Sequence, residues 1–363
     1  MGWQRRVGRI ANFLEGYYDA LMHAYTKYLD RNPSIQIVSY RGFGSRKRIF
    51  LKGRVLKDKR ISTGSETDSR WRNFVNTLKR FNSSEVPEAR VQVSIRGWSG
   101  EIRADEEGYF DVIVEPAIPL DPDRLWHDVE FDLLEPRTSA GAVHQTGQFL
   151  VPPLTARFGV ISDMDDTVVQ TGAGNVFGMM STVLLGNALT RLPFEGVASF
   201  YQSLQGVELN PLFYVSSSPW NFYDILTEFF RLHQIPMGPL FLRDWGVSEE
   251  EVLPTDHRNH KVTTIRRILD TLPELPFILI GDSSQEDPEI YQEIAAIHPG
   301  RILGIYIRAV GHNPQRFERI KAIGNHVHEM GSVLVLAPET RDAASHAAQM
   351  GWIQSTGSQI QNI

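Results

Sequence analysis

The hydrophobic positions divide the chain into stretches with different periods. Over residues 1–29 apolar side chains recur every three or four positions with charges between them, which predicts an amphipathic helix, packed on its own domain or lying on a surface. From residue 30 to 150 the period shortens to two, in runs such as IQIVSY and HDVEFDLLE. This predicts a β-sandwich-like antiparallel module, interrupted by a helical stretch near residues 71–78. Pro152-Pro153 predicts a hinge behind the module.

From residue 155 short apolar runs alternate with amphipathic stretches. The apolar runs are Phe158–Ser162, Pro211–Ser216, Pro239–Leu242, Phe277–Gly281 and Ile302–Ile307, and the amphipathic ones include Asn221–His233 and Lys261–Leu272. Alternating strands and helices are typical of an α/β doubly wound parallel sheet, which binds ligands beyond the carboxyl ends of its strands. We predict an α/β domain over residues 155–330. A closing segment over residues 331–363 should contain a short helix at Ala344–Ile353.

Length and composition agree with this division. A chain of 363 residues suggests two domains, and 42% hydrophobic with 22% charged residues is typical of a globular protein. The absence of cysteine excludes disulfides, thiolate metal sites and cysteine nucleophiles. The N-terminal stretch has no apolar core of the kind found in secretory signals, so we expect a cytoplasmic protein.

Positive charge is concentrated in one stretch, although the net charge is −6. Residues 41–60 hold nine Lys or Arg residues and one acid, Asp58. Such a run attracts phosphate-rich surfaces, each basic residue adding about 1 kcal/mol near an anionic membrane. Alternatively, the charges lie on a solvated strand edge and discourage edge-to-edge pairing.

Three carboxylates directly follow the first apolar run of the α/β region, in Asp163-Met164-Asp165-Asp166-Thr167. Carboxylates this close repel one another unless a cation is present. Mg²⁺ suits a site that combines few protein carboxylates with a phosphate. Taken alone, the run also fits a polar turn or a helix cap.

Three further features fall at the ends of later runs or just after them. Ser216-Ser217-Ser218 closes a strand with hydroxyls that can bind phosphate oxygens. Lys261 stands at the expected start of a helix, where an anion is favoured, although it also fits an ordinary helix surface. Gly281-Asp282 ends another strand and is followed by further acids up to Asp287.

These features resemble, in order, the four motifs of haloacid dehalogenase-like phosphatases: Asp163-x-Asp165-x-Thr167, Ser216, Lys261, and Gly281-Asp282 with Asp287. The strings Ser216–Asn221 and Gly281–Tyr291, with the uncharged run after Asp166, resemble the App1-type phosphatidate phosphatases. That family has a DxDxT catalytic domain behind a β-rich region. The resemblance covers roughly residues 155–330 well and the N-terminal third only in outline.

The resemblance implies Mg²⁺-dependent hydrolysis of phosphatidate to diacylglycerol, with a role for each motif residue. Asp163 would be the nucleophile and Asp165 the general acid and base, while Ser216 and Lys261 would bind phosphate. The metal ligands would be Asp163, the carbonyl of Asp165, Asp282 and Asp287. Thr167 would fix the turn, Asp166 has no expected role, and Ser217 and Ser218 are candidates to cap the next helix.

Residues 167–190 carry no charge and lie where the superfamily inserts a flap. Their glycines and amides argue against a membrane span. A flap that touches acyl chains and a buried helix both stay open. The expected partner is a phospholipid at a membrane surface, bound peripherally, with no nucleic acid. The alternatives are a phosphatase of soluble small molecules or phosphopeptides and a non-catalytic membrane-associated adaptor.

Overall fold

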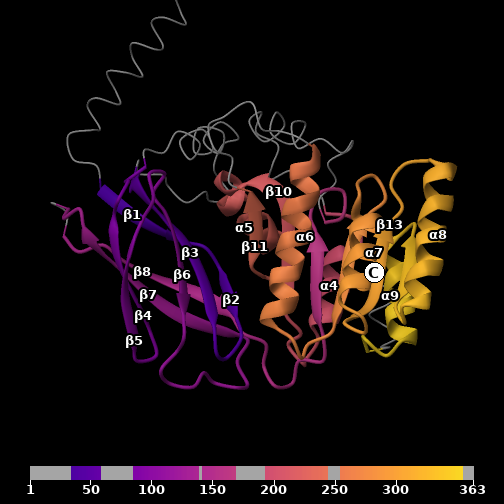
Figure 1. Ribbon diagram of the computed structural model, residues 1–363, viewed down its shortest axis with the longest axis horizontal. Coiled ribbons are helices and arrows are strands. Elements are labelled where there is room, and N and C mark those ends of the chain that lie inside the picture. Colours follow the sequence, from indigo (N-terminus) through magenta and orange to yellow (C-terminus); the bar gives the residue numbers. More distant parts are fainter. Residues whose placement is uncertain (1–33, 59–84, 139–140, 169–192, 244–253, 355–363) are drawn as a thin grey trace, which may run out of the picture.

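A computed structural model describes residues 34–58, 85–138, 141–168, 193–243 and 254–354. The predicted helices over residues 1–29 and near residues 71–78 lie outside these ranges, as does most of the expected flap. Two β-sheets stand side by side, the first in the N-terminal part and the second flanked by helices (Figure 1). Among the described residues, no helix is long and apolar enough to cross a membrane.

The N-terminal part, here called the β-module, is mainly β as predicted. Its strands are β1 (Ser34–Ser39), β2 (Gly42–Gly44), β3 (Ile49–Asp58), β4 (Arg90–Ile95), β5 (Trp98–Arg103), β6 (Tyr109–Val114), β7 (Trp126–Glu135) and β8 (His144–Leu150). They join in the order β1-β3-β2-β8-β7-β4-β5, with β6 paired to β3. All pairs are antiparallel except β2 with β8.

The single sheet of the β-module folds over its own core. Alternate residues of β4 are buried, as the period of two predicts. Val91 of β4 and Val55 of β3 belong to one hydrophobic cluster, although β2, β8 and β7 separate these strands in the sheet. Distant strands therefore face each other across the cluster, which gives a sandwich-like arrangement within one hydrogen-bonded sheet.

The second sheet is entirely parallel. Its strands are β9 (Gly159–Asp163), β10 (Leu212–Pro219), β11 (Leu240–Arg243), β12 (Phe277–Asp282), β13 (Ile302–Arg308) and β14 (Val333–Ala337). Their order is β11-β10-β9-β12-β13-β14. The five predicted strands are confirmed. The sheet also continues past residue 330, because β14 is its edge strand.

Helices cover both faces of the parallel sheet. They are α4 (Val197–Gln205), the short 3-10 turn η2 (Trp220–Phe222), α5 (Tyr223–Leu232), α6 (Pro254–Thr271), α7 (Asp287–Ile297), α8 (Pro314–Glu329) and α9 (Thr340–Gln349). Residues of α4, α5 and α9 share one core cluster with the sheet, and residues of α6, α7 and α8 share the other. The last helix is the expected C-terminal one, shifted toward the N-terminus. The chain moves outward from β9 in one direction and from β12 in the other, so β9 and β12 flank the switch point where such sheets bind ligands.

Aromatic side chains join the β-module to the α/β part along a contact surface that we call the seam. Tyr40 packs against Trp220 and Tyr223, with ring centroids 4.4 and 4.7 Å away. Phe43 packs edge-on against Phe213 and Phe241. The backbone N–H of residue 41 also donates to the Tyr223 hydroxyl over 2.8 Å. These contacts place the two parts in one continuous core.

The basic run 41–60 is only partly solvated, because several of its side chains lie at the seam. Arg54 is 6% exposed and donates to the Glu107 carbonyl, the Asn221 side chain and Glu85. Its guanidinium also lies 4.1 Å from the centroid of the Tyr109 ring. The expectation of a solvated strand edge is therefore wrong for Arg54, because Asn221 of the α/β part and the turn before β6 contact it.

Candidate active site

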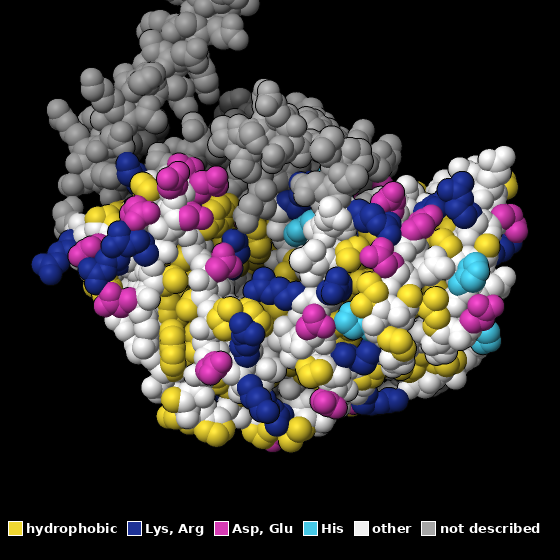
Figure 2. Space-filling view, viewed as in Figure 1, with side chains coloured by type: hydrophobic (Ala, Val, Ile, Leu, Met, Phe, Trp, Pro, Cys, Tyr) yellow, Lys and Arg dark blue, Asp and Glu magenta, His cyan; other side chains and the backbone are white. Residues whose placement is uncertain are grey.

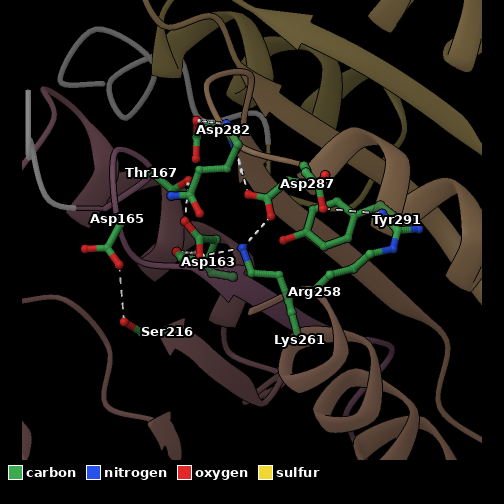
Figure 3. Close-up of polar contacts among 12 residues, drawn as sticks. Asp163, Asp165, Thr167, Ser216, Arg258, Lys261, Asp282, Asp287 and Tyr291 are labelled. Atoms are coloured by element: carbon green, nitrogen blue, oxygen red, sulfur yellow. Dashed lines mark hydrogen bonds and ion pairs between the residues drawn. The ribbon is translucent and has the colours of Figure 1, made fainter. Parts of the chain in front are cut away.

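The carboxyl edge of the parallel sheet gathers side chains from separate elements. Asp163 ends β9, Asp282 ends β12 and Ser216 lies in the last half of β10. Asp287 opens α7 and Lys261 lies on α6. Figure 3 shows that they converge on one small region. Because the strands are parallel and adjacent, their ends bring together residues more than 100 positions apart.

Lys261 joins two of the carboxylates. Its Nζ donates to Asp163 Oδ1 over 2.8 Å and also to Asp287 Oδ1. All three residues are buried. Burial acts to lower the pKa of Lys261, but Asp163 and Asp287 outweigh it and hold the pKa above its ordinary value. Lys261 therefore stays charged.

The helix position of Lys261 differs from the prediction. α6 begins at Pro254, so Lys261 lies about two turns inside the helix rather than at its start. The N-terminal helix dipole acts only within the first turn, and Lys261 acts through its ammonium group.

Asp163, Asp282 and Asp287 form the group that fits a metal ion. Each offers a carboxylate oxygen, and these oxygens lie within 4.8 Å of one another. Asp282 Oδ1 accepts hydrogen bonds from Ser284 and Gln285, whereas its buried Oδ2 has no partner among the described residues. Three buried carboxylates face one ammonium group, and one buried carboxylate oxygen has no partner among the described residues, so the donor set fits a cation. Hard oxygen donors of this kind suit Mg²⁺.

The pKa values of Asp163 and Asp282 also reflect the excess of negative charge in this buried group. Burial, and then the charge of Asp287, raise the pKa of Asp282 to about 7. Burial also raises the pKa of Asp163 well above its usual range, against the opposing effect of Lys261. Repulsion and desolvation both favour the protonated forms, and a bound cation would reverse this preference.

Asp165 occupies a different part of the site. Its Oδ2 accepts a hydrogen bond from Ser216 Oγ over 3.3 Å, and Figure 3 shows the side chain directed toward Ser216. Asp165 is 7% exposed. Its carboxylate is not among the grouped metal-ligand oxygens.

The serines after Ser216 do not cap a helix. β10 continues through Pro219, so Ser217 and Ser218 lie in the strand. Pro219 precedes the short helical turn η2, and no side chain caps that turn. The strand is longer than the expected run because it stays buried throughout and pairs with β11 at its far end.

Hydrogen bonds from nearby residues hold Asp163 in place, and the sequence did not reveal these contacts. Thr167 Oγ1 donates to Asp163 Oδ2 over 3.3 Å. The Asp163 carbonyl accepts from Ser162 Oγ, which in turn bonds the Tyr201 hydroxyl. Asp166 is buried and adopts a left-handed φ of 53°, which turns the chain behind Asp163. Two features of the sequence could have indicated these contacts. Ser162 is a polar residue in an otherwise apolar strand, and Asp166 is an acid at a turn position.

Gly281 is required by the close approach of α7. A Cβ at this position would lie 2.4 Å from Asp287 Oδ2. The same Asp287 oxygen accepts from the Asp282 backbone N–H over 3.1 Å. The Gly-Asp pair therefore lets the first residue of α7 reach the strand end.

The site lies at the switch point of a parallel α/β sheet, with acidic residues suited to a divalent cation and hydroxyl groups beside them. Residues 158–309 match the family model described as the catalytic domain of phosphatidate phosphatase APP1. Residues 158–309 therefore belong to the App1 catalytic-domain family, and the chain is similar to the App1-type phosphatidate phosphatases.

Two curated relatives extend the match. The chain is 32% identical to phosphatidate phosphatase APP1 of Saccharomyces cerevisiae over 264 residues, which is 70% of this chain and 44% of that protein. It is 30% identical to the uncharacterized protein C29B5.04c of Schizosaccharomyces pombe over 238 residues, 64% of this chain and 36% of that one. The chain thus spans less than half the length of either relative.

Solved structures give only weak similarity. A carbohydrate acetylesterase from Xanthomonas citri, XAC1771, shares 12% identity at a TM-score of 0.27, with 81% of this chain and 75% of that chain covered. This likeness is too weak to bear on fold or function.

Proposed function

We propose that this chain is a Mg²⁺-dependent phosphoric monoester hydrolase that converts phosphatidate to diacylglycerol and phosphate. The observation that carries the proposal is the buried contact of Asp163 with Lys261, beside Asp282 and Asp287, at the carboxyl edge of the sheet. We assign a haloacid dehalogenase-like catalytic domain to residues 155–330, together with β14 and α9, and the β-module to residues 30–150. The family match supports phosphatidate as the substrate.

Asp163 is the proposed nucleophile. Its two carboxylate oxygens are held by Lys261 and Thr167, which fixes the direction of attack. One oxygen attacks phosphorus, the bond from phosphorus to the ester oxygen breaks, and an aspartyl-phosphate forms. Lys261 and the hydroxyl of Ser216 would stabilise the charge on the phosphoryl oxygens.

Asp165 is the proposed general acid and base. Protonated, it donates its proton to the leaving alkoxide, which gives the alcohol group of diacylglycerol. Ionised, it then accepts a proton from the water that attacks the aspartyl-phosphate, and phosphate leaves while the Asp163 carboxylate is restored. Before substrate binds, the Ser216 hydroxyl donates a hydrogen bond to the Asp165 carboxyl group, and it would turn to the phosphoryl oxygens in the substrate complex.

Asp163, Asp282, Asp287 and the carbonyl of Asp165 would hold Mg²⁺. When bound, the ion supplies positive charge that offsets the repulsion between the carboxylate nucleophile and the phosphate dianion. Asp282 offers the oxygen that lacks a partner among the described residues.

The test measures phosphate release from phosphatidate in mixed micelles and from a panel of soluble phosphoesters, each with Mg²⁺ and with EDTA. We expect turnover of phosphatidate that EDTA abolishes. Turnover of soluble esters alone would disprove the lipid assignment and favour the soluble-substrate alternative. Absence of turnover on every ester would favour the adaptor alternative.

Asp163→Asn tests the mechanism. We expect phosphate release to fall by about 10⁴-fold or more, because the amide is a poor nucleophile. Asp123→Asn, at an exposed loop position of the β-module, is the matched control and should keep full activity. Full activity in Asp163→Asn would exclude the aspartyl-phosphate route.

A further inference from the structure

A groove of about 1090 Å³ lies on the seam, away from the acidic group of the candidate active site. One wall is the turn between β2 and β3, a second is the connecting segment at residues 151–156, and the third is α6 with the loop behind it, over residues 263–275. Figure 2 shows Lys and Arg side chains along the boundary between the β-module and the α/β part, with hydrophobic side chains beside them.

Basic side chains from both parts line one region of the groove. Arg46, Lys47 and Arg48 come from the β2–β3 turn, and Arg266 and Arg267 come from α6. No ion pair involves any of these five among the described residues, whereas Arg90 and Arg103 of the β-module each have a carboxylate partner. The five side chains therefore form a cluster of positive charge without a direct ion pair.

Two of these guanidiniums contact the same aromatic ring. The Arg267 guanidinium carbon lies 4.4 Å from the centroid of the Phe50 ring, and that of Arg48 lies 5.2 Å from it. Burial lowers the pKa of Arg267, the charge of Asp111 opposes this shift, and the positive charge of Arg48 adds to it. Two guanidiniums that line one groove favour an anionic ligand.

The other residues that line the groove are apolar or acidic, and they restrict which ligands can bind. Pro152, Leu154, Leu272 and Leu275 provide apolar contacts, and Leu154 is 70% exposed. Asp270 and Glu274 lie on the same wall and would repel a ligand with several negative charges. A polyanion such as an acidic peptide is therefore disfavoured, and a ligand with one anionic end and one apolar end fits best.

We propose that the seam groove binds an amphiphile with a single anionic head group, the head group between Arg48 and Arg267 and the apolar chain along Leu154 and Leu275. The head-group chemistry is an oxyanion, supplied by either a phosphate or a carboxylate. Because walls of both parts form the groove, a bound amphiphile would also hold the β-module against α6.

The experiment is calorimetric titration of the full chain with dodecanoate below its micelle concentration. Dodecanoate carries no phosphate, so its binding does not depend on the proposed phosphatase activity. We expect saturable binding with one site, and binding at least about tenfold weaker in Arg48→Gln/Arg267→Gln, because both charge-assisted contacts are removed. The control Arg96→Gln/Arg319→Gln, which removes two exposed arginines elsewhere, should bind like the parent.

Further arms separate the sources of the head group and protect against a folding artefact. Dodecylphosphonate, whose carbon–phosphorus bond is not hydrolysed, tests a phosphate-like head, and the tighter of the two amphiphiles identifies the natural head group. Leu154→Asp, at an exposed position, should weaken both without touching the arginines. Folding of each variant is checked by circular dichroism.

Three results would overturn the proposal. The first is that dodecanoate and dodecylphosphonate both bind the parent and Arg48→Gln/Arg267→Gln equally, or that neither amphiphile binds the parent. The second is that acetate and inorganic phosphate bind as tightly as the amphiphiles, which would mean that the apolar wall does not contribute to binding. The third is that a hexaglutamate peptide binds more tightly than dodecanoate, with the same dependence on Arg48 and Arg267. That result would indicate a protein partner instead.

Discussion

The carboxyl edge of the parallel sheet and the seam both bury charged side chains, but the buried charges are paired differently in the two regions. At the edge, Asp163, Asp282 and Asp287 face a single ammonium group, and one carboxylate oxygen has no partner among the described residues. At the seam, Arg54 directs donors to three partners and lies over an aromatic ring. Buried charge that is fully paired holds a structure together, whereas buried charge that lacks a partner is ready to bind an ion or a substrate.

Lys261→Met gives the largest expected effect and tests the edge. Removing the ammonium leaves Asp163 and Asp287 without their shared partner, so activity should fall by about 10³-fold and the free energy of unfolding by about 3–5 kcal/mol. Phosphate release and urea denaturation measure the two effects. Lys321→Met, at an exposed position of α8, is the control. Normal stability in Lys261→Met would mean that the edge does not depend on this pairing.

Phe43→Ala tests the seam, where packing rather than charge should dominate. Phe43 is 3% exposed and contacts Phe213 and Phe241, so truncation should cost about 3–4 kcal/mol of unfolding free energy. We expect kcat per folded molecule to change less than about threefold, because the strand ends keep their positions. Ile113→Ala, at a site that is 48% exposed, should be close to neutral. A loss of activity as large as in Lys261→Met would erase the distinction between the two regions.

Addition of Mg²⁺ should stabilise only the edge. At a concentration about 100 times its dissociation constant, the ion should raise the free energy of unfolding by about 2.7 kcal/mol. Thermal unfolding with Mg²⁺ and with EDTA measures this. Asp282→Asn should lose most of the shift, whereas Asp111→Asn, on the β-module, should keep it. An equal shift in Asp282→Asn would place the ion elsewhere.

His260 lies between the two regions and gives the smallest effect. Burial lowers the pKa of His260 to about 4, and its Nε2 has no partner among the described residues. The unfolded chain therefore takes up a proton near pH 6.5 that the folded chain resists, so stability is present above that pH and lost as the pH falls toward 4. The loss should be on the order of 2 kcal/mol.

The check is the difference in unfolding free energy between pH 7 and pH 5 for the parent and for His260→Gln. The variant should show a smaller loss, and His312→Gln, on the surface, should match the parent. If His260→Gln loses as much stability as the parent, another group carries the acid sensitivity.

Local pattern accounts for most of what could be predicted. Apolar runs of strand length predicted β9 to β13, and adjacent parallel strands place their carboxyl ends on one edge. Asp163, Ser216, Lys261, Asp282 and Asp287 were therefore expected at one site before their distances were known, and the structure brings them together. The strand after residue 331 was harder to predict, because β14 is half-buried and its hydrophobic pattern is less distinct than that of a central strand.

The sequence by itself determined the alternation of strands and helices, the acidic strand ends and the change of period at the hinge, because each depends on neighbouring residues. Only the tertiary structure decided that Lys261 bonds both Asp163 and Asp287, that Asp165 faces Ser216, and that Arg54 contacts the distant turn before β6. It also decided that Tyr40 and Phe43 complete the core of the α/β part. These contacts join residues far apart in the chain, and which faces meet depends on the packing of whole sheets rather than on any local period.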